Sequence, residues 1–211
     1  MGAKVGCSGR RLLGRVLMVV GTLLVAGALG LFALNAWEDR RAGGTAAAVA
    51  VQLEEARGAA DDPASEPVAA GPAASSSDAM ASITIGGYAY VGTLAIPALG
   101  LDLPVMASWD GDYDALAVAP CRQFGSLQTH DLVIAGHNYA SHFGGLSRLA
   151  AGDEVGFTDV AGRAWRYRVA LVETLEPEAV DDVRESPWDL TLYTCTYGGT
   201  SRVVVRCTAI S

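Results

Sequence analysis

Hydrophobic and polar positions divide the chain into three stretches of different pattern. Residues 16–37 carry no charged side chain, and a helix of that length spans roughly 33 Å at about 1.5 Å per residue, enough to cross a bilayer core. Residues 42–82 are rich in Ala, Gly, Ser, Pro and acidic residues and lack the large apolar side chains that a core requires. From Ile83 onward, short β-rich segments alternate with turn residues, which predicts a β-sandwich or barrel.

The third stretch is therefore expected to be a single all-β domain over residues 83–211. Its predicted strands are 89–96, 101–105, 131–135, 154–157, 165–174, 190–196 and 202–208. Two short helices are expected in the connections, at 113–118 and 143–149. Glycine and proline residues separate these segments.

Charges beside the apolar stretch predict its orientation. Four basic residues precede it, whereas the acidic and basic residues that follow it nearly cancel. The positive-inside rule then makes residues 1–15 cytoplasmic, residues 16–37 a signal-anchor helix in contact with membrane lipid, and the rest extracellular. A cleaved signal peptide is the alternative, and the apolar stretch is longer than such peptides usually have. Residues 38–82 are expected to be an extracellular tether, whose first part has the helix propensity to extend the membrane helix.

Composition removes several classes of function. The formal net charge is -8, and six of the basic residues flank the membrane stretch, so nucleic acid is not an expected partner. The four cysteines form no CxxC pair and show no metal-ligand spacing with the three histidines. Neither a metal, an organic cofactor nor a disulfide framework is predicted.

Cys195 lies at the end of the predicted strand 190–196. Side chains alternate between the two faces of a strand, which places Leu190 and Leu192 toward the core and Cys195 on the outward face. An accessible thiol at a strand end suits a nucleophile. Free cysteine is also a common buried residue, so the thiol alone leaves a structural role open.

A histidine and an arginine are predicted to accompany this thiol. His137 follows an apolar strand and a glycine, which delivers it into a loop at the strand end. Arg202 begins the last strand, and antiparallel pairing across the short turn brings it close to Cys195. In the simpler interpretation, His137 is a surface loop histidine and Arg202 is a solvated edge-strand arginine. The first description fits His130 and His142 better, and the second fits Arg206 better.

These residues lie in motifs that resemble those of the sortase family. TLYTC at 191–195, followed by Arg202 in SRVVVRC, is similar to the family's TLxTC and RxxV strands, and IAGHN at 134–138 is similar to its histidine motif. GTLAIPALGLDLPV and FGGLSRLAAGDEVGFTD resemble further family segments, so the resemblance runs from about Tyr90 to Cys207.

The resemblance implies an eight-stranded β-barrel with short connecting helices, preceded by one transmembrane helix. It implies that Cys195 attacks the Thr-Gly bond of an LPxTG-like sorting signal on surface proteins and forms a thioacyl enzyme. The acyl group then passes to an amine of a peptidoglycan precursor or a pilin. His137 exchanges protons with the leaving and incoming amines, Arg202 holds the oxyanion or substrate carbonyls, and Thr194 and Asn138 are secondary oxyanion or substrate candidates.

Further expectations concern the subclass and the remaining cysteines. Pilin-assembling sortases carry a lid with Asp-Pro-aromatic, but Asp62-Pro63 is followed by Ala64, so this lid is not expected. The segment 175–189 has room for at most two turns of helix. Cys207 is expected to point into the core, and Cys121 is expected to be structural. A non-catalytic extracellular β binding module and an extracellular thiol redox protein are the alternative functions.

Overall fold

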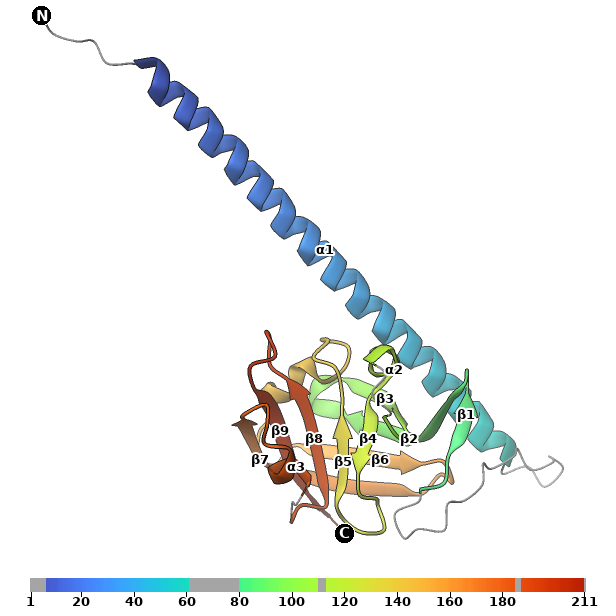
Figure 1. Cartoon of the computed structure of the whole chain (residues 1–211). Helices are drawn as coiled ribbons and strands as arrows, with labels where there is room; N and C mark the ends of the chain where they lie inside the picture. Colours follow the sequence, from blue (N-terminus) through green and yellow to red (C-terminus); the bar gives the residue numbers. More distant parts are fainter. Residues whose placement is uncertain (1–6, 61–79, 110–112, 185–186, 211) are drawn as a thin grey trace, which may run out of the picture. The chain divides into compact units, whose positions relative to one another are not determined.

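The computed structural model describes residues 7–60, 80–109, 113–184 and 187–210. The chain divides into two compact units, residues 1–40 and residues 41–211. Residues 7–40 of the first unit belong to the N-terminal helix α1, and the second unit contains the end of that helix together with a β-barrel (Figure 1). Within the described residues, one helix is long and apolar enough to cross a membrane, between Leu13 and Gly58.

Nine strands form the sheet in the part of the chain that the structure describes, and eight of them close into a barrel. The strands are β1 (Ile83–Ile85), β2 (Tyr88–Ile96), β3 (Leu101–Met106), β4 (Cys121–Phe124), β5 (Leu132–Ala135), β6 (Glu154–Asp159), β7 (Ala164–Leu175), β8 (Leu190–Cys195) and β9 (Arg202–Ala209). The barrel order is β2-β3-β4-β5-β8-β9-β7-β6, and pairing of β6 with β2 closes the ring. The short β1 pairs with the first part of β2 outside the ring. The expected eight-stranded barrel is confirmed.

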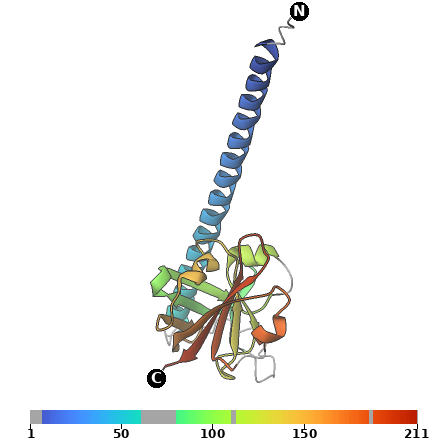
Figure 2. The ribbon, with the colours of Figure 1, turned by 90° about the vertical axis from the view of Figure 1, so that its left-hand side faces the viewer.

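Five helices accompany the barrel: α1 (Cys7–Ala60), η1 (Pro97–Leu99), α2 (Tyr113–Val118), η2 (Phe143–Arg148) and α3 (Val180–Arg184). The helices expected at 113–118 and 143–149 are present, the second as a 3-10 helix. Figure 2 shows α3, in orange, outside the sheet. Among the described residues of the segment 175–189, α3 is the helix, and its 5 residues make fewer than two turns.

The core lies inside the barrel and accounts for the strand pattern. Leu190 and Leu192 of β8 are fully buried in the main cluster, as alternation along the strand predicted. The partners of these two residues on β9, Cys207 and Val205, belong to the same cluster. One face of β8 is thereby fixed inward, and Cys195, at an odd spacing from the leucines, faces outward and is exposed.

The last part of α1 belongs to the folded domain, which changes the boundary expected at residue 83. Four apolar side chains between residues 41 and 60 are buried at helical spacing: Ala42, Ala46, Val49 and Leu53. Ala46 joins the main core, while Val49 and Leu53 pack with residues of β2, β3 and α2. Alanine favours helix formation, and its small side chain allows close packing. The alanine-rich composition that suggested a tether is therefore also compatible with a helix that has a buried face. The rest of the expected tether, 61–79, lies outside the described residues.

Candidate active site

Cys195 and Arg202 face each other on neighbouring strands. They form the last residue pair of the antiparallel ladder between β8 and β9. The turn that joins them is held by backbone bonds from Thr196 to Ser201 and from Gly199 to Thr196. Arg202 donates from Nη1 to the carbonyl oxygens of Gly199 and Ser201, both at 3.2 Å. A guanidinium is thus fixed on the turn beside the exposed thiol.

His137 reaches the same level from the opposite side of β8. The strand β5 runs parallel to β8, with Ala135 in register with Tyr193. The Gly136 N–H donates to the Tyr193 carbonyl at 3.1 Å, which extends the pairing by one residue. Two residues after Ala135 is His137, and two residues after Tyr193 is Cys195. The register therefore places the backbone of His137, just after β5, at the level of Cys195 at the end of β8 and of Arg202 at the start of β9; β5, β8 and β9 are adjacent strands (Figure 1).

The electrostatics of Tyr193 reflect this closeness. Burial raises the pKa of Tyr193 to about 12, the positive charge of Arg202 acts in the opposite direction, and the Cys195 thiolate acts in the same direction as burial. Tyr193 lies two residues before Cys195 on the outward face of β8. The Tyr193 hydroxyl therefore stays neutral at physiological pH, and the nearby Arg202 and Cys195 both act on its pKa.

Residues 136–144, which we name the histidine loop, form a compact turn around His137. The Phe143 N–H donates to the His137 carbonyl at 3.0 Å, and the Gly144 N–H donates to the Tyr139 carbonyl at 2.8 Å. The ring of Tyr139 lies 4.9 Å from that of His137, tilted by 34°, and 5.8 Å from that of His142. The imidazole of His137 thus lies at one end of a row of three rings in contact, in which the Tyr139 and His142 rings meet edge to face.

The two secondary candidates, Thr194 and Asn138, connect the histidine loop to β8. The Thr194 hydroxyl is buried and donates to the Gly136 carbonyl at 2.8 Å, so its side chain serves the strand junction. Asn138 Nδ2 lies 3.5 Å from the Thr196 carbonyl, just beyond the thiol. The Thr194 hydroxyl is thus occupied at the strand junction, whereas Asn138 bridges the segments that carry His137 and Cys195.

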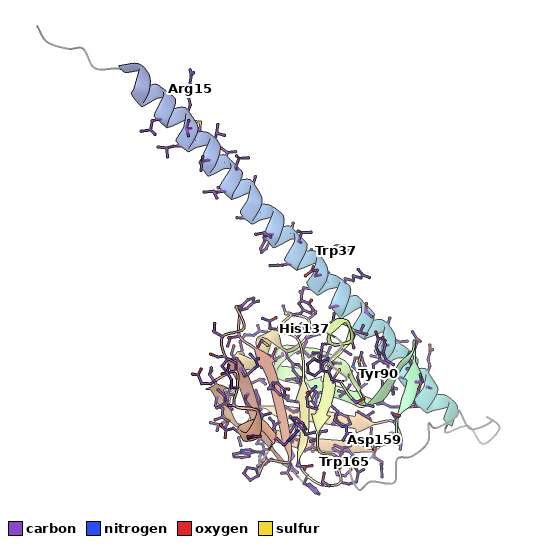
Figure 3. All side chains as sticks on the ribbon, in the orientation of Figure 1. Arg15, Trp37, Tyr90, His137, Asp159 and Trp165 are labelled. Atoms are coloured by element: carbon purple, nitrogen blue, oxygen red, sulfur yellow. The ribbon has the colours of Figure 1, made fainter. Side chains whose placement is uncertain are left out.

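The other two histidines occupy different environments. His130 is exposed and lies 3.1 Å from Asp189 and 6.5 Å from the Trp165 ring. Figure 3 shows Trp165 near the end of the barrel opposite to His137. The expected surface position is thus correct for His130 but wrong for His142, which is 0% exposed. Its ring packs behind Tyr139 because the histidine loop folds back on itself.

An apolar cluster lies beside the site on the outside of the sheet. Its buried members are Val133, Val183 and Val204, and Phe124, Leu175 and Tyr193 pack against them. Val183 comes from α3, which covers this part of the sheet. Val204 pairs with Tyr193 two residues along the ladder from the pair formed by Cys195 and Arg202. The outward face of β8 and β9 is therefore apolar next to the thiol.

Arg206 is buried, which corrects its expected role as a solvated edge-strand arginine. Its side chain is 4% exposed. It donates from Nε to Glu173 at 2.8 Å and from Nη2 to the Asp182 carbonyl at 2.8 Å. The strand β9 is an inner strand of a closed barrel, and α3 covers this position, so the guanidinium requires these partners. Arg206 ties α3 to the sheet and leaves Arg202 as the arginine beside the thiol.

The two cysteines of the barrel domain other than Cys195 lie inside the protein. Cys207 is fully buried, and burial raises the pKa of its thiol to about 12. Cys121 is also fully buried and contacts the Met106 sulfur at 3.6 Å. The expected inward direction of Cys207 is confirmed. Cys195 is the exposed thiol among these three.

Comparisons with known proteins identify the class to which this barrel belongs. The Sortase domain family model matches residues 94–210, and the chain therefore belongs to the sortase family of transpeptidases. This match includes β3 to β9 and all three proposed site residues. A comparison with curated protein sequences finds no match.

Solved sortase structures share this fold. Sortase C-1 from Actinomyces oris is 28% identical, with a TM-score of 0.50, over 57% of this chain and 73% of that chain. Sortase C1 from Streptococcus agalactiae is 25% identical, with a TM-score of 0.51, over 61% of this chain and 71% of that chain. A third, sortase C1 from Streptococcus suis, is 23% identical, with a TM-score of 0.50, over 58% of this chain and 73% of that chain.

The Asp62-Pro63-Ala64 segment, which has alanine where the expected lid motif has an aromatic residue, lies outside the described residues.

Proposed function

We propose that this protein is a membrane-anchored sortase that joins surface proteins to an amine through a thioacyl intermediate on Cys195. The observation that carries the proposal is the register of three adjacent strands, which brings His137, Cys195 and Arg202 to one level. The substrate class is an extracellular protein with an LPxTG-like sorting signal. The acceptor is an amine of a peptidoglycan precursor or of a pilin subunit.

The chemistry follows from the properties of the three side chains. The Cys195 thiolate attacks the carbonyl carbon of the Thr-Gly bond, and its sulfur forms the new bond. Arg202 and backbone N–H groups at the end of β8 stabilise the negative charge on the carbonyl oxygen. The His137 imidazolium then gives its proton to the leaving amine as the C–N bond breaks. In the second half, neutral His137 takes a proton from the acceptor amine, which displaces the thiolate and forms an amide.

The apolar cluster beside the thiol supports a peptide substrate. A sorting signal of this type has leucine and proline before the scissile bond, and these side chains require an apolar surface. Tyr193 and Val204 lie on the same outward face as Cys195, with α3 beside them. Val204 is 0% exposed whereas Tyr193 is partly exposed, so we place the leucine and proline of the signal against Tyr193, which orients the carbonyl toward Cys195 and Arg202.

Incubation of the full-length protein with an LPxTG-containing peptide and triglycine tests this function. We expect two products: a thioester adduct on the peptide that contains Cys195, and a peptide joined through its threonine to triglycine. Mass spectrometry detects both. Hydroxylamine is the matched control, because it cleaves a thioester and leaves an amide intact. A non-catalytic binding module would retain the peptide unmodified, and that outcome would remove the enzyme assignment.

The orientation of the chain is part of the proposal. The apolar part of α1 fits a membrane anchor, and the basic residues before it place the N-terminus in the cytoplasm and the barrel outside. A protease added to intact cells should then cut the chain within the Ala/Gly/Pro/Ser-rich stretch 61–82. A denaturing gel should show the barrel as a separate fragment, although the packed end of α1 holds it at the cell surface before denaturation. A tag at the N-terminus should stay protected until the cells are lysed. Protection of the barrel in intact cells would contradict this orientation.

A further inference from the structure

The segment of α1 from Gly43 to Arg57 spans two functionally different parts of the folded domain. Arg57, near the end of the helix, is 7% exposed and reaches the place where the barrel closes. Its Nη2 donates to the Thr158 carbonyl at 2.8 Å and lies 3.3 Å from the Thr93 hydroxyl. Thr93 and Thr158 are directly paired residues of β2 and β6, the closing pair of strands. One end of the segment is therefore fixed to the closure of the barrel.

The other end of the segment contacts the histidine loop. A Cβ atom added at Gly43 would lie 2.9 Å from the Ser141 Cβ and 3.4 Å from its Oγ. This separation is shorter than carbon atoms tolerate, so a glycine is needed for the helix to approach so closely. Gly44, the next residue, has open space at the same position. Gly43 thus marks a tight contact between helix and loop.

The contact continues from Ser141 to His137 through the loop itself. Ser141 directly precedes His142, whose ring packs on Tyr139, and Tyr139 packs on His137. The backbone adds a second connection, because Phe143 N–H donates to the His137 carbonyl. A displacement of Ser141 must therefore change either the contacts among these three rings or this hydrogen bond, and His137 takes part in both.

Between its two ends the segment is held by the core. Ala46 belongs to the main cluster, as does Phe143 of the histidine loop, and Leu53 is fully buried against β2 and α2. The helix therefore cannot slide along the barrel without breaking buried contacts. It acts as a rigid spacer between the barrel closure and the loop.

We propose that the segment 43–57 of α1 is a positioning element for His137, with Gly43 as the contact that sets the height of the histidine loop over β8. The inference rests on the proposed role of His137 as the acid/base partner of Cys195. It goes beyond the family match, which begins at residue 94 and does not include this helix. The same helix continues into the apolar stretch, so the anchor and the positioning element are one continuous helix.

Gly43→Leu and Gly44→Leu, made separately in the full-length protein, test the inference. Both replace a helical glycine by leucine and so gain the same helix propensity, but only the first adds atoms against Ser141. We expect Gly43→Leu to lower the rate of acylation on the order of 10- to 100-fold, the scale of a misplacement of about 1 Å. Gly44→Leu should keep the parent rate, and the thermal midpoint of each variant controls for folding.

A spectroscopic readout separates this inference from the proposed function. The chain has three histidines, so imidazole signals of histidine-labelled protein in detergent micelles are assignable by single substitutions. The His137 signal and its pH titration should change in Gly43→Leu and not in Gly44→Leu, whether or not the protein proves to be a transpeptidase. Equal His137 titrations in the two variants would overturn the inference.

A milder pair of changes covers the case in which Gly43→Leu fails to fold. Gly43→Ala adds one carbon at 2.9 Å from the Ser141 Cβ, and Ser141→Gly removes that carbon. If the contact sets the height of the loop, Gly43→Ala alone should lower the acylation rate. The double variant Gly43→Ala/Ser141→Gly should have nearly the same acylation rate as Ser141→Gly alone. Additive effects of the two changes would contradict the inference.

Discussion

Cys195→Ala is expected to abolish acyl transfer, with a loss on the order of 10⁶-fold, as seen when the nucleophile of a catalytic unit is deleted. The reason is that neither of the other two thiols of the barrel domain can replace it. Cys195 is exposed beside Arg202, whereas Cys121 and Cys207 are buried. At neutral pH the Cys207 thiol stays protonated, because burial raises its pKa to about 12. The measurement is thioester formation with the sorting peptide.

Cys207→Ala and Cys121→Ala are the matched controls for that prediction. Each removes a buried sulfur and should reduce the free energy of unfolding by about 1 kcal/mol, while acylation remains measurable. Peptide-resolved alkylation adds a second check, because iodoacetamide should label Cys195 in the native protein and Cys207 only after unfolding. Loss of the thioacyl adduct in Cys207→Ala, with the fold intact, would refute the assignment of the nucleophile.

Arg202→Lys is expected to give the second large loss, about 10²- to 10³-fold in the rate of acylation, equal to about 2.7 to 4 kcal/mol for one oxyanion donor. The Arg202 guanidinium is held by the carbonyls of Gly199 and Ser201 and lies directly across the ladder from Cys195. An ammonium group cannot make these bonds and also present a planar fork to the substrate. Single-turnover acylation kinetics measure the effect, and the thermal midpoint should change little.

Arg166→Lys provides the control for Arg202→Lys. Arg166 lies on β7, its side chain is 60% exposed, and its partner is Glu154 at 3.3 Å. Exposed pairs of this kind contribute at most about 1 kcal/mol, so lysine should replace arginine with little effect. Arg206 is unsuitable as this control because its substitution would break a buried network. Equal, small effects at Arg202 and Arg166 would remove Arg202 from the catalytic set.

The position of the histidine loop explains why this site requires a closed barrel. His137 comes from a strand that runs parallel to β8, and Arg202 comes from a strand that runs antiparallel to it. Parallel neighbours cannot be joined by a short turn, so 54 residues lie between Ala135 and Leu190. That connection contains η2, β6, β7 and α3, and it completes the barrel as well as the apolar surface beside the thiol.

The sequence alone determined the features that depend on local pattern. Alternation along 190–195 predicted which face of β8 is buried, and the short turn before Arg202 predicted its pairing with Cys195. The seven predicted strands are present, with ends shifted by at most two residues. The strands β1 and β4 were not predicted. The three residues of β1 are too few to show an alternating pattern, and β4, with the sequence Cys-Arg-Gln-Phe, lacks the apolar run that marked β5, a strand of the same length.

Only the tertiary structure decided the features that depend on what covers a residue. Arg206 and His142 have polar side chains in segments that look exposed, yet α3 and the histidine loop bury them. The segment 41–60 reads as a tether by composition, yet four of its apolar side chains are buried against the barrel. Burial is set by contacts between elements far apart in the chain, and no local pattern records those contacts. The approach of Gly43 to Ser141 is of this kind, since it joins residues 98 positions apart through a glycine that the sequence gives no reason to select.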